Sequence, residues 1–271
     1  MKDAKIFDLR FNFLAELPNG RASYSERFGR SRMGCSQIQD SKFPFLKFMR
    51  KRTIIESPKK FKTGIIGVGM VGGALAGVLE KPFLFDSGKK IGSMEEVNMA
   101  DVIFISVPTP FDEKKKGFDL SIVEEVFKKI EGGKIVVIKS TVLPGTTEYF
   151  QDKYPQHKVL FNPEFLTEVT ADQDMRYPDR QIVGFTKESF SVAGDVMQIL
   201  PLAPFERVMP AAEAEMVKYF NNTWVSTKVI YANQIYDFCK KLGIDYEIVK
   251  EAAAADKRIG RSHLEIFHKG Y

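Results

Sequence analysis

The sequence predicts an α/β protein, in which a doubly wound parallel sheet is followed by one long helix. The expected strands are short apolar runs dense in β-branched or aromatic residues, at 64–66, 83–85, 101–107 and 134–138. Between them, 74–79 and 120–130 have helical spacing, and such alternation gives a parallel sheet with right-handed crossovers. A later stretch, 211–242, is helical and apolar on more than one side, so we expect it to be covered on each side.

The first expected strand leads into a glycine-rich turn, Gly67-Val68-Gly69-Met70-Val71-Gly72. Gly67 allows a tight turn, Gly69 lets the backbone approach a pyrophosphate, and Gly72 lets the following helix pack closely on the strand. The amino end of that helix would face the anion. The turn therefore predicts a dinucleotide site formed by Gly67, Gly69, Met70, Val71 and Gly72.

An acidic residue completes this expected site. Asp86 follows the second expected strand, 19 residues after Gly67, close to the ~20 expected for the acid that binds the adenosine ribose. An acid there repels a 2′-phosphate, so NAD is favoured over NADP, although Lys89 and Lys90 are near enough to weaken that preference. The alternative interpretation is that Asp86 merely begins a turn.

Three short motifs follow further strands, at the carboxyl edge where ligands of such sheets bind. They are Val107-Pro108-Thr109-Pro110, Lys139-Ser140-Thr141-Val142, and Asn162-Pro163-Glu164-Phe165-Leu166 with Glu168 beyond it. Taken alone, the first is a rigid proline turn, and the second opens a helix for which Thr146 is a plausible cap. Glu164 and Glu168 would share a face of one helical turn, where like charges repel. Such a pair suits acid/base work better than stability.

Together these motifs resemble the nucleotide-sugar 6-dehydrogenases, the family of UDP-glucose dehydrogenase and GDP-mannose dehydrogenase. The resemblance covers roughly residues 62–271 and implies a Rossmann-type NAD-binding domain, a long central helix and the start of a helical dimerisation domain. The implied cofactor contacts are Val107, Pro108, Thr109, Ser140, Thr141 and Glu168. The chain departs from the family at Val169, where Gly is usual, which leaves the local backbone path in question because Val disfavours a positive φ.

The same resemblance implies an acid/base site. Thr141 would hold a water and the substrate oxygen, and Glu164 would assist the water in a hydrolytic step. Lys218 and Asn222, at i and i+4 on the long helix, would stabilise and position the reacting oxygen. Arg258 would reach the sugar or phosphate, often from the partner subunit, with its bidentate fork. The implied substrate contacts are Glu164, Phe165, Leu166, Lys218, Asn222 and Arg258.

The expected reaction is the NAD-dependent oxidation of a nucleotide sugar, similar to UDP-glucose, at C6 to the uronate. The family's nucleophilic Cys would follow Gly260, so we expect a C-terminally truncated chain without that Cys and without the nucleotide-sugar-binding domain; neither Cys35 nor Cys239 is placed to replace it. The alternative is a non-catalytic fragment or split-gene product that binds NAD and dimerises. A 3-hydroxyisobutyrate-type dehydrogenase would share the glycine turn and the long helix but not the run from Asn162 to Glu168.

Charge and composition set the remaining expectations. We expect a basic, poorly ordered extension at 1–60, an NAD-binding domain at 61–210 and an incomplete helical domain at 211–271. Lys and Arg outnumber Asp and Glu by 14 to 6 in the extension, where a nucleic-acid arm is the less favoured alternative to a solvated tail. No apolar run reaches the ~18 residues of a membrane span, and two cysteines fit a reducing cytosol. The expectation is a cytoplasmic homodimer, joined through the 211–242 helix, that contacts no membrane and holds no metal.

Overall fold

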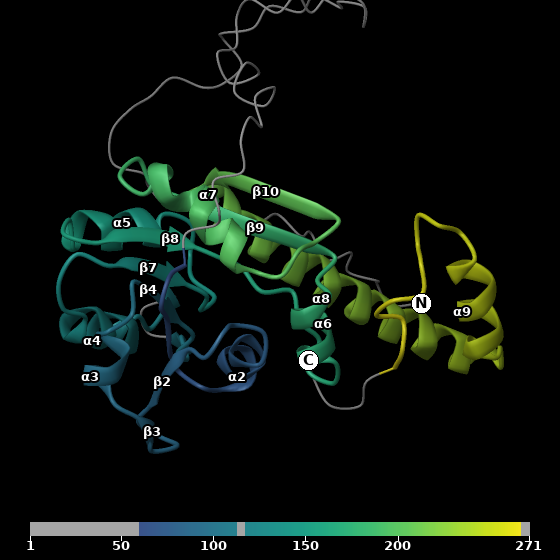
Figure 1. The fold of residues 1–271 in the computed structure, drawn as a ribbon. Helices are drawn as coiled ribbons and strands as arrows, with labels where there is room; N and C mark the ends of the chain where they lie inside the picture. Colours follow the sequence, from purple (N-terminus) through teal and green to yellow (C-terminus); the bar gives the residue numbers. More distant parts are fainter. Residues whose placement is uncertain (1–59, 113–116, 267–271) are drawn as a thin grey trace, which may run out of the picture. The chain divides into compact units, whose positions relative to one another are not determined.

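One sheet of eight strands organises the part of the chain that the computed structural model describes, residues 60–112 and 117–266 (Figure 1). From one edge to the other its strands are β3 (Ile91–Gly92), β2 (Phe83–Asp86), β1 (Thr63–Ile66), β4 (Val102–Ile105), β7 (Ile135–Ile138), β8 (Lys158–Phe161), β9 (Arg180–Phe185) and β10 (Phe205–Pro210). A separate hairpin pairs β5 (Phe111–Asp112) with β6 (Gly117–Phe118). Apart from Lys60, the expected extension lies outside the described residues, as does Cys35.

The sheet is mostly parallel. The strands β2, β1, β4, β7 and β8 all run in one direction, and the chain order reverses between β1 and β4. Ligands of such sheets bind beyond the carboxyl ends of the strands at this reversal. The edges differ from the expected parallel arrangement, because β3 is antiparallel to β2, and β9 is antiparallel to β8 with β10 parallel to β9. The segment between β8 and β9 begins and ends at the carboxyl ends of the parallel strands. The chain therefore runs through β9 in the direction opposite to β8.

Helices cover both faces of the sheet because successive residues of each strand point to opposite faces. In β4, Ile103 belongs to one buried apolar cluster and Phe104 to the other. The first cluster packs under α3 (Met94–Val97), α4 (Ser121–Lys129) and α5 (Thr146–Lys153). The second packs under α2 (Met70–Ala76), α6 (Ala171–Arg176) and α7 (Phe190–Ile199). This two-sided core confirms the doubly wound architecture.

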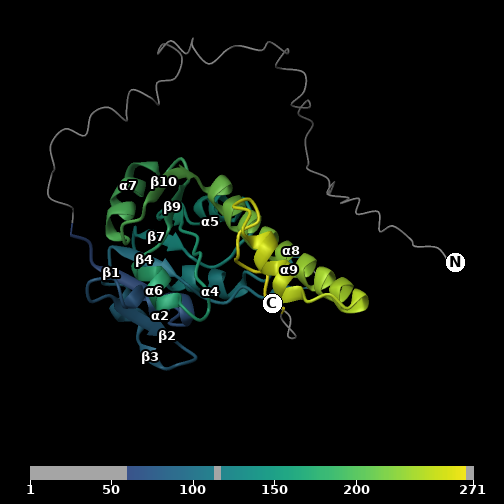
Figure 2. The ribbon, with the colours of Figure 1, turned by 90° about the vertical axis from the view of Figure 1, so that its right-hand side faces the viewer.

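The long helix expected over 211–242 is α8 (Ala211–Leu242), and its bounds agree with the prediction. It follows β10 directly and ends at Gly243, whose φ of 67° is left-handed. Its first turn packs on Gly184 of β9, and α9 (Tyr246–Ala254) folds back against its later turns (Figure 2). Cys239 is buried in α8, whereas the expected domain boundary at 210–211 stays a prediction. None of the described helices is both long and apolar enough to cross a membrane.

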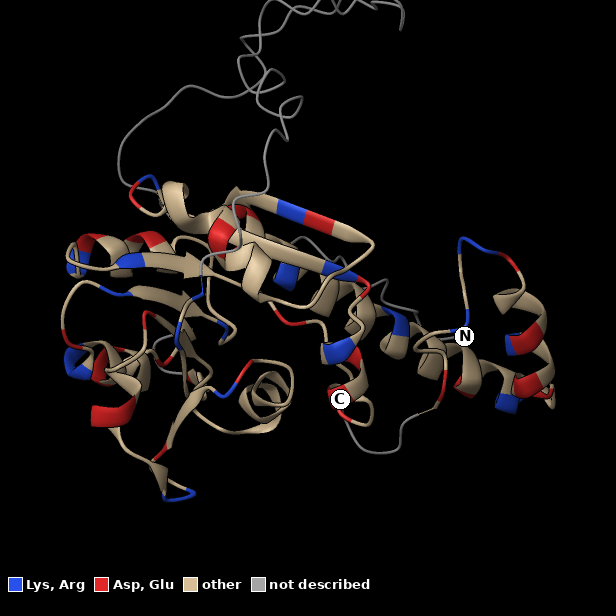
Figure 3. Cartoon of the chain, viewed as in Figure 1, with Lys and Arg blue, Asp and Glu red and all other residues tan. Residues whose placement is uncertain are grey.

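Acidic and basic residues are interspersed over the described helices and strands (Figure 3). Four Lys or Glu side chains among the described residues are nevertheless buried, namely Lys139, Glu215, Lys218 and Lys250. Lys250 forms ion pairs with Glu247 and Glu265. Removing a charge from water costs several kcal/mol unless it is well paired, and such buried groups often belong to functional sites, so Lys139, Glu215 and Lys218 mark where chemistry is to be sought.

Candidate functional site

The glycine-rich turn is tightly packed at two of its glycines and open at the third. Gly67 has a φ of +89°, and a Cβ there would lie 2.3 Å from the carbonyl oxygen of Ser106. A Cβ on Gly72 would lie 1.9 Å from the carbonyl oxygen of Gly67, so helix α2 approaches the strand as closely as the sequence predicts. A Cβ on Gly69 would meet nothing within 4 Å. Gly69 therefore leaves space in which an anion can approach the backbone.

Asp86, at the end of β2, is tied to this turn. Its Oδ2 accepts a hydrogen bond from Val68 N at 2.8 Å, and its Oδ1 accepts one from Lys89 N at 2.8 Å. The backbone N–H groups of Lys89 and then of Val68 hold the pKa of the Asp86 carboxyl below its ordinary value. The Lys89 Nζ donates to the Val68 carbonyl at 2.6 Å. Asp86 thus begins a turn, as the alternative interpretation held. Its carboxylate also holds the glycine loop in place through the hydrogen bond from Val68 N.

A cavity of ≈ 480 Å³ lies beside the glycine loop. Gly69, Met70 and Glu168 line it together with the start of α6, so three of the expected cofactor residues come together there. Val71 instead packs partly buried against the core below. Val169 is 93% exposed and is not among the described non-glycine residues with positive φ. The path of the backbone at this position therefore does not require a glycine.

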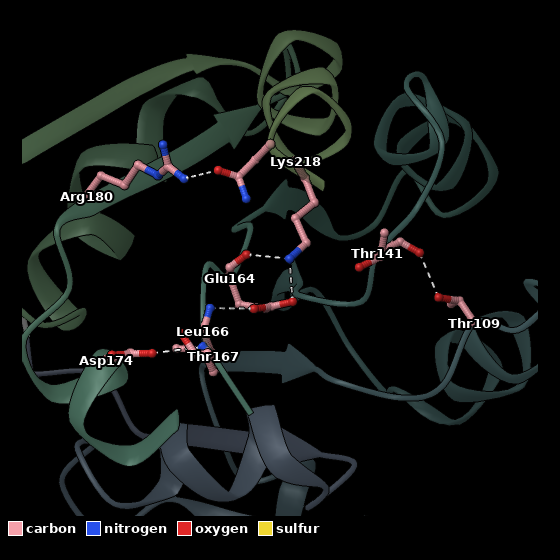
Figure 4. A network of polar contacts seen from close by, with 9 residues as sticks. Thr109, Thr141, Glu164, Leu166, Thr167, Asp174, Arg180 and Lys218 are labelled. Atoms are coloured by element: carbon pink, nitrogen blue, oxygen red, sulfur yellow. Dashed lines mark hydrogen bonds and ion pairs between the residues drawn. The ribbon is translucent and has the colours of Figure 1, made fainter. Parts of the chain in front are cut away.

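The loops after β4 and β7 are joined by two hydrogen bonds. Thr109 Oγ1 donates to the Thr141 carbonyl at 2.7 Å (Figure 4), and Ser140 Oγ donates to the Val107 carbonyl at 2.7 Å. These four expected cofactor residues are brought together at the carboxyl edge, with Pro108 exposed between them. The expectation that Thr146 caps the next helix is wrong.

Helix α5 begins without a side-chain cap of its own. Its N-cap is Gly145, with a left-handed φ of 93°, and the Thr146 Oγ1 donates backwards to the Leu143 carbonyl at 2.6 Å. A hydroxyl that donates in this way lies within the helix rather than before it. The amide groups of Gly145 and Thr147 instead donate to the carboxylate of Glu215, from α8.

A buried ion pair joins α8 to the loop after β8. Lys218 Nζ lies 2.6 Å from Glu164 Oε1 and 2.7 Å from the Glu164 carbonyl oxygen. The two side chains are only 8% and 14% exposed. Glu164 Oε2 accepts a further hydrogen bond from Leu166 N at 2.9 Å, so both carboxylate oxygens are occupied (Figure 4). An acid and a cationic donor are thereby held in contact within a site partly shielded from water.

The expectation that Glu164 and Glu168 share a face of one helical turn is wrong. Residues 162–167 form no helix, and α6 begins only at Ala171. The backbone is held open because its N–H groups bond to side chains instead of to a helical ladder, with Thr167 N donating to Asp174 at 2.8 Å. Glu164 consequently lines a cavity of ≈ 300 Å³, whereas Glu168 lines the cavity beside the glycine loop.

The ≈ 300 Å³ cavity also receives Phe165, Leu166 and Arg180. The Arg180 guanidinium carbon lies 3.8 Å from the centroid of the Phe165 ring, and Arg180 also donates to Asn221 of α8 at 2.6 Å. Arg180 was not among the predicted site residues. Of those that were, Asn222 is exposed on α8, one turn beyond Lys218.

Arg258 lies apart from this cavity, in the turn after α9. It forms an ion pair with Asp256 at 2.6 Å, and its side chain is 90% exposed. The expectation that Arg258 contacts substrate from a partner subunit therefore stays a prediction.

Lys139 is a site residue that the sequence analysis missed. It follows β7, is 4% exposed, and lines the same cavity as Glu164. Its Nζ donates to Asn162 Oδ1 at 2.6 Å, and Asn162 in turn donates to the Ile182 carbonyl at 2.7 Å. Burial lowers the pKa of Lys139 to about 8, against the opposing charge of Glu164. The sequence did hold a signal for Lys139, because this lysine directly follows a strand that is expected to be buried on both faces.

Replacing Lys139 with Met should change how stability depends on pH. The folded chain holds the pKa of Lys139 at about 8, against 10.5 ordinarily, so the unfolded chain binds more protons above pH 8. The stability of the wild type relative to Lys139→Met should therefore rise by about 2 kcal/mol between pH 7 and 9.5. The unpaired Asn162 oxygen lowers the stability of the variant equally at every pH. Denaturant unfolding at several pH values measures this difference, with the exposed Lys241→Met as control; a difference independent of pH would contradict the assignment.

A glycine loop that follows the first strand of a doubly wound sheet and is held by an acid at the end of the second strand defines a dinucleotide-binding domain of dehydrogenase type. Comparison with family models places the chain more narrowly. Residues 87–199 match the NAD binding domain of the UDP-glucose/GDP-mannose dehydrogenase family, and residues 212–270 match the central domain of the same family. The chain belongs to this family of NAD-dependent oxidoreductases. The first match begins after the glycine loop, so the loop geometry is a separate observation.

Curated relatives agree with this assignment. The chain is 33% identical over 177 residues to the UDP-glucose 6-dehydrogenase of Rickettsia conorii, and 37% identical over 181 residues to that of Pseudomonas aeruginosa. These matches cover 62% and 59% of the chain, but 41% and 39% of the relatives. The chain therefore spans about two fifths of the length of these curated relatives.

Solved structures show the same fold. A UDP-glucose dehydrogenase from the hyperthermophilic archaeon Pyrobaculum islandicum superposes with a TM-score of 0.65 at 28% identity, covering 78% of this chain and 60% of that one. A ternary complex of GDP-mannose dehydrogenase from Pseudomonas aeruginosa superposes with a TM-score of 0.62 at 26% identity, covering 72% and 57%.

Proposed function

We propose that this chain supplies the NAD-binding and acid/base residues for the NAD-dependent oxidation of a nucleotide sugar, similar to UDP-glucose, at C6 to the uronate. The observation that carries the proposal is the buried contact of Lys218 Nζ with Glu164 Oε1 at 2.6 Å, beside a cavity at the carboxyl edge of the sheet. A cation and an acid held together suit the removal of a proton from an alcohol and the stabilisation of the resulting oxyanion. Membership of the family supports the substrate class.

The glycine loop fits the dinucleotide NAD. Gly69 leaves open space at the cavity of ≈ 480 Å³, where the pyrophosphate would approach, and Asp86 is fixed as an anion at the end of β2, where the ribose hydroxyls would bind. Ser140 and Thr141 stand at the neighbouring loop, and Glu168 faces the cavity from the other side. Bound NAD would accept the hydride, while these side chains bind and orient it.

In the resting chain the carboxylate and the ammonium neutralise each other. A substrate hydroxyl entering the ≈ 300 Å³ cavity would compete for Glu164 Oε1, which can take up its proton. Lys218 could then donate to the developing alkoxide while it keeps its contact with the Glu164 carbonyl. Asn222, one turn further along α8, is exposed, and its contact with the same group is an expectation from the family resemblance. This arrangement assigns proton uptake to Glu164 and charge stabilisation to Lys218.

A non-catalytic role in NAD binding and dimerisation is the second candidate, and one observation favours it. Cys239, the cysteine within the described residues, is buried on α8. Oxidation of an alcohol to a carboxylate by two hydride transfers is assisted by a thiol that holds the aldehyde between them. A buried thiol does not serve that purpose.

NAD binding should depend on Asp86. We expect Asp86→Ala to lower the affinity for NAD roughly 10-fold or more, because a hydrogen-bonded charge is lost. The affinity for NADP should fall less, because the repulsion between Asp86 and the 2′-phosphate is lost too. Calorimetric titration of both dinucleotides measures this, with the exposed neighbour Ser87→Ala as control. An equal loss of affinity for both dinucleotides in Asp86→Ala would contradict the contact of Asp86 with the ribose.

The two candidate functions differ in the NADH that they produce. We expect the purified chain, incubated with NAD and UDP-glucose or GDP-mannose, to form no more than a trace of NADH, because Cys239 is buried. The absorbance of NADH measures the yield. Two equivalents per sugar would favour the complete reaction by this chain alone and would overturn the second candidate. The variants Cys35→Ser and Cys239→Ser would then identify whether either thiol holds the aldehyde between the two oxidations.

We also propose that α8 forms a homodimer contact. Large apolar side chains recur every four or seven residues along one side of the helix and are all more than half exposed: Met216, Phe220, Trp224, Tyr231, Phe238 and Leu242. The buried face of α8, which includes Lys218 and Val229, lies opposite. A helix with two apolar faces requires a partner on each, and a two-fold symmetric contact between identical chains is the commonest arrangement.

Charges placed on this exposed stripe should separate the dimer. We expect the double variant Trp224→Glu and Tyr231→Glu to sediment as a monomer, because two carboxylates cannot be buried without partners. The control is Lys240→Glu, which is exposed on the other side of α8 and should leave the sedimentation coefficient unchanged. A wild-type chain that sediments as a monomer would exclude the dimer outright.

A further inference from the structure

Glu215 joins two segments that both carry site residues. It is fully buried on α8, one turn before Lys218. Its Oε2 accepts from Gly145 N at 2.6 Å, and its Oε1 accepts from Thr147 N at 2.9 Å and from Thr147 Oγ1 at 2.6 Å. The loop that these contacts hold begins with Ser140 and Thr141, some 70 residues away in sequence. One carboxylate therefore connects the start of α5 to the part of α8 that carries Lys218.

The loop is held from both ends. At its beginning, Thr109 Oγ1 and the Val107 carbonyl fasten it to the loop after β4. At its end, the three donors of Gly145 and Thr147 fasten it to Glu215. Thr141 carries one of the attachments at the beginning of the loop, through its carbonyl oxygen. Its position relative to Lys218 is consequently set by Glu215 on one side and by Thr109 on the other.

Helix capping alone does not account for a buried carboxylate. A Ser, Thr, Asp or Asn at the N-cap would satisfy the free amides of α5 from an exposed position, yet Gly145 stands there. Glu215 meets no Lys, Arg or His in an ion pair of the described residues, and burial raises the pKa of its carboxyl to about 7, against the opposing effect of its donors. Burying such a group costs stability that a local cap would not. What the distant acid adds is a fixed spacing between the loop and α8.

We propose that Glu215 is a positioning residue, which holds the loop of Ser140 and Thr141 in register with the Lys218 turn of α8. The proposal rests on the proposed function, because that function gives Ser140 and Thr141 their cofactor contacts. Glu215 touches neither substrate nor cofactor. Its effect passes through Gly145 and Thr147 to the loop.

The test compares Glu215→Ala and Glu215→Gln with the exposed Glu213→Gln, which lies two residues earlier on α8. Hydrogen exchange of the amides of residues 145–147 reports whether the loop is released. NAD affinity, measured by calorimetry well below the unfolding midpoint, reports whether the site is displaced. We expect Glu215→Ala to speed amide hydrogen exchange at Gly145 and Thr147. We also expect it to lower the affinity for NAD roughly 10-fold, since small misplacements of binding groups have large effects.

Glu215→Gln should recover most of the NAD affinity, because its amide oxygen can still accept both donors of Thr147, and Glu213→Gln should behave as the wild type. Faster exchange in Glu215→Ala with unchanged NAD affinity would overturn the proposal and leave Glu215 as a helix cap only. If Glu215→Ala does not fold, Thr147→Val removes one of the three contacts and should weaken NAD by a smaller factor, and no change would again overturn the proposal. A wild-type chain that fails to bind NAD contradicts the proposed function, and hydrogen exchange then still decides whether Glu215 holds the loop.

Discussion

The buried contact of Lys218 with Glu164 fixes the relation between the long helix and the sheet. It links residues 54 apart in sequence, one on α8 and one in the loop after β8. Removing either partner would leave a largely buried charge without its ion-pair partner, which destabilises the fold. The loop from Asn162 to Leu166 and the first turns of α8 are therefore held together as one unit. The cavity that receives Phe165 and Arg180 is formed on this unit.

Three further polar side chains extend the same logic along the carboxyl edge. Lys139 and Asn162 occupy the interior beneath Glu164, and Glu215 ties α8 to the start of α5. Each of these groups is buried and is satisfied by protein partners in one arrangement. An apolar core tolerates exchange of similar shapes, whereas a polar network of this kind admits few alternatives. The polar contacts at this edge of the sheet therefore restrict the arrangements that the loops and α8 can adopt.

Local patterns in the sequence predicted strands β1, β2, β4 and β7 and the long helix, whereas β3, β9 and β10 were not predicted. Those strands are dense in β-branched residues, the bounds of α8 follow from helical spacing, and the glycine turn follows from residues such as Gly67, whose conformation few others adopt. The reversed direction of β9, the open backbone at Glu164 and the absent cap at Thr146 depended on distant partners, which no local spacing reveals. Lys139 and Glu215 escaped prediction for the same reason, because a charged residue in sequence is solvated by default. The roles of all the predicted site residues, Asn222 and Arg258 among them, remain predictions from sequence patterns and family resemblance.

The attachment of Asp86 to Val68 and Lys89 is made within the chain itself and gives the glycine loop its shape. The loss of conformational freedom is then incurred during folding, and association with a dinucleotide has less ordering left to accomplish. The same attachment makes nucleotide preference inseparable from loop geometry. An engineer who exchanges the acid for a small residue to admit a 2′-phosphate also deprives Val68 N of its acceptor, so a change of preference would require a second substitution that supplies a new acceptor to the loop.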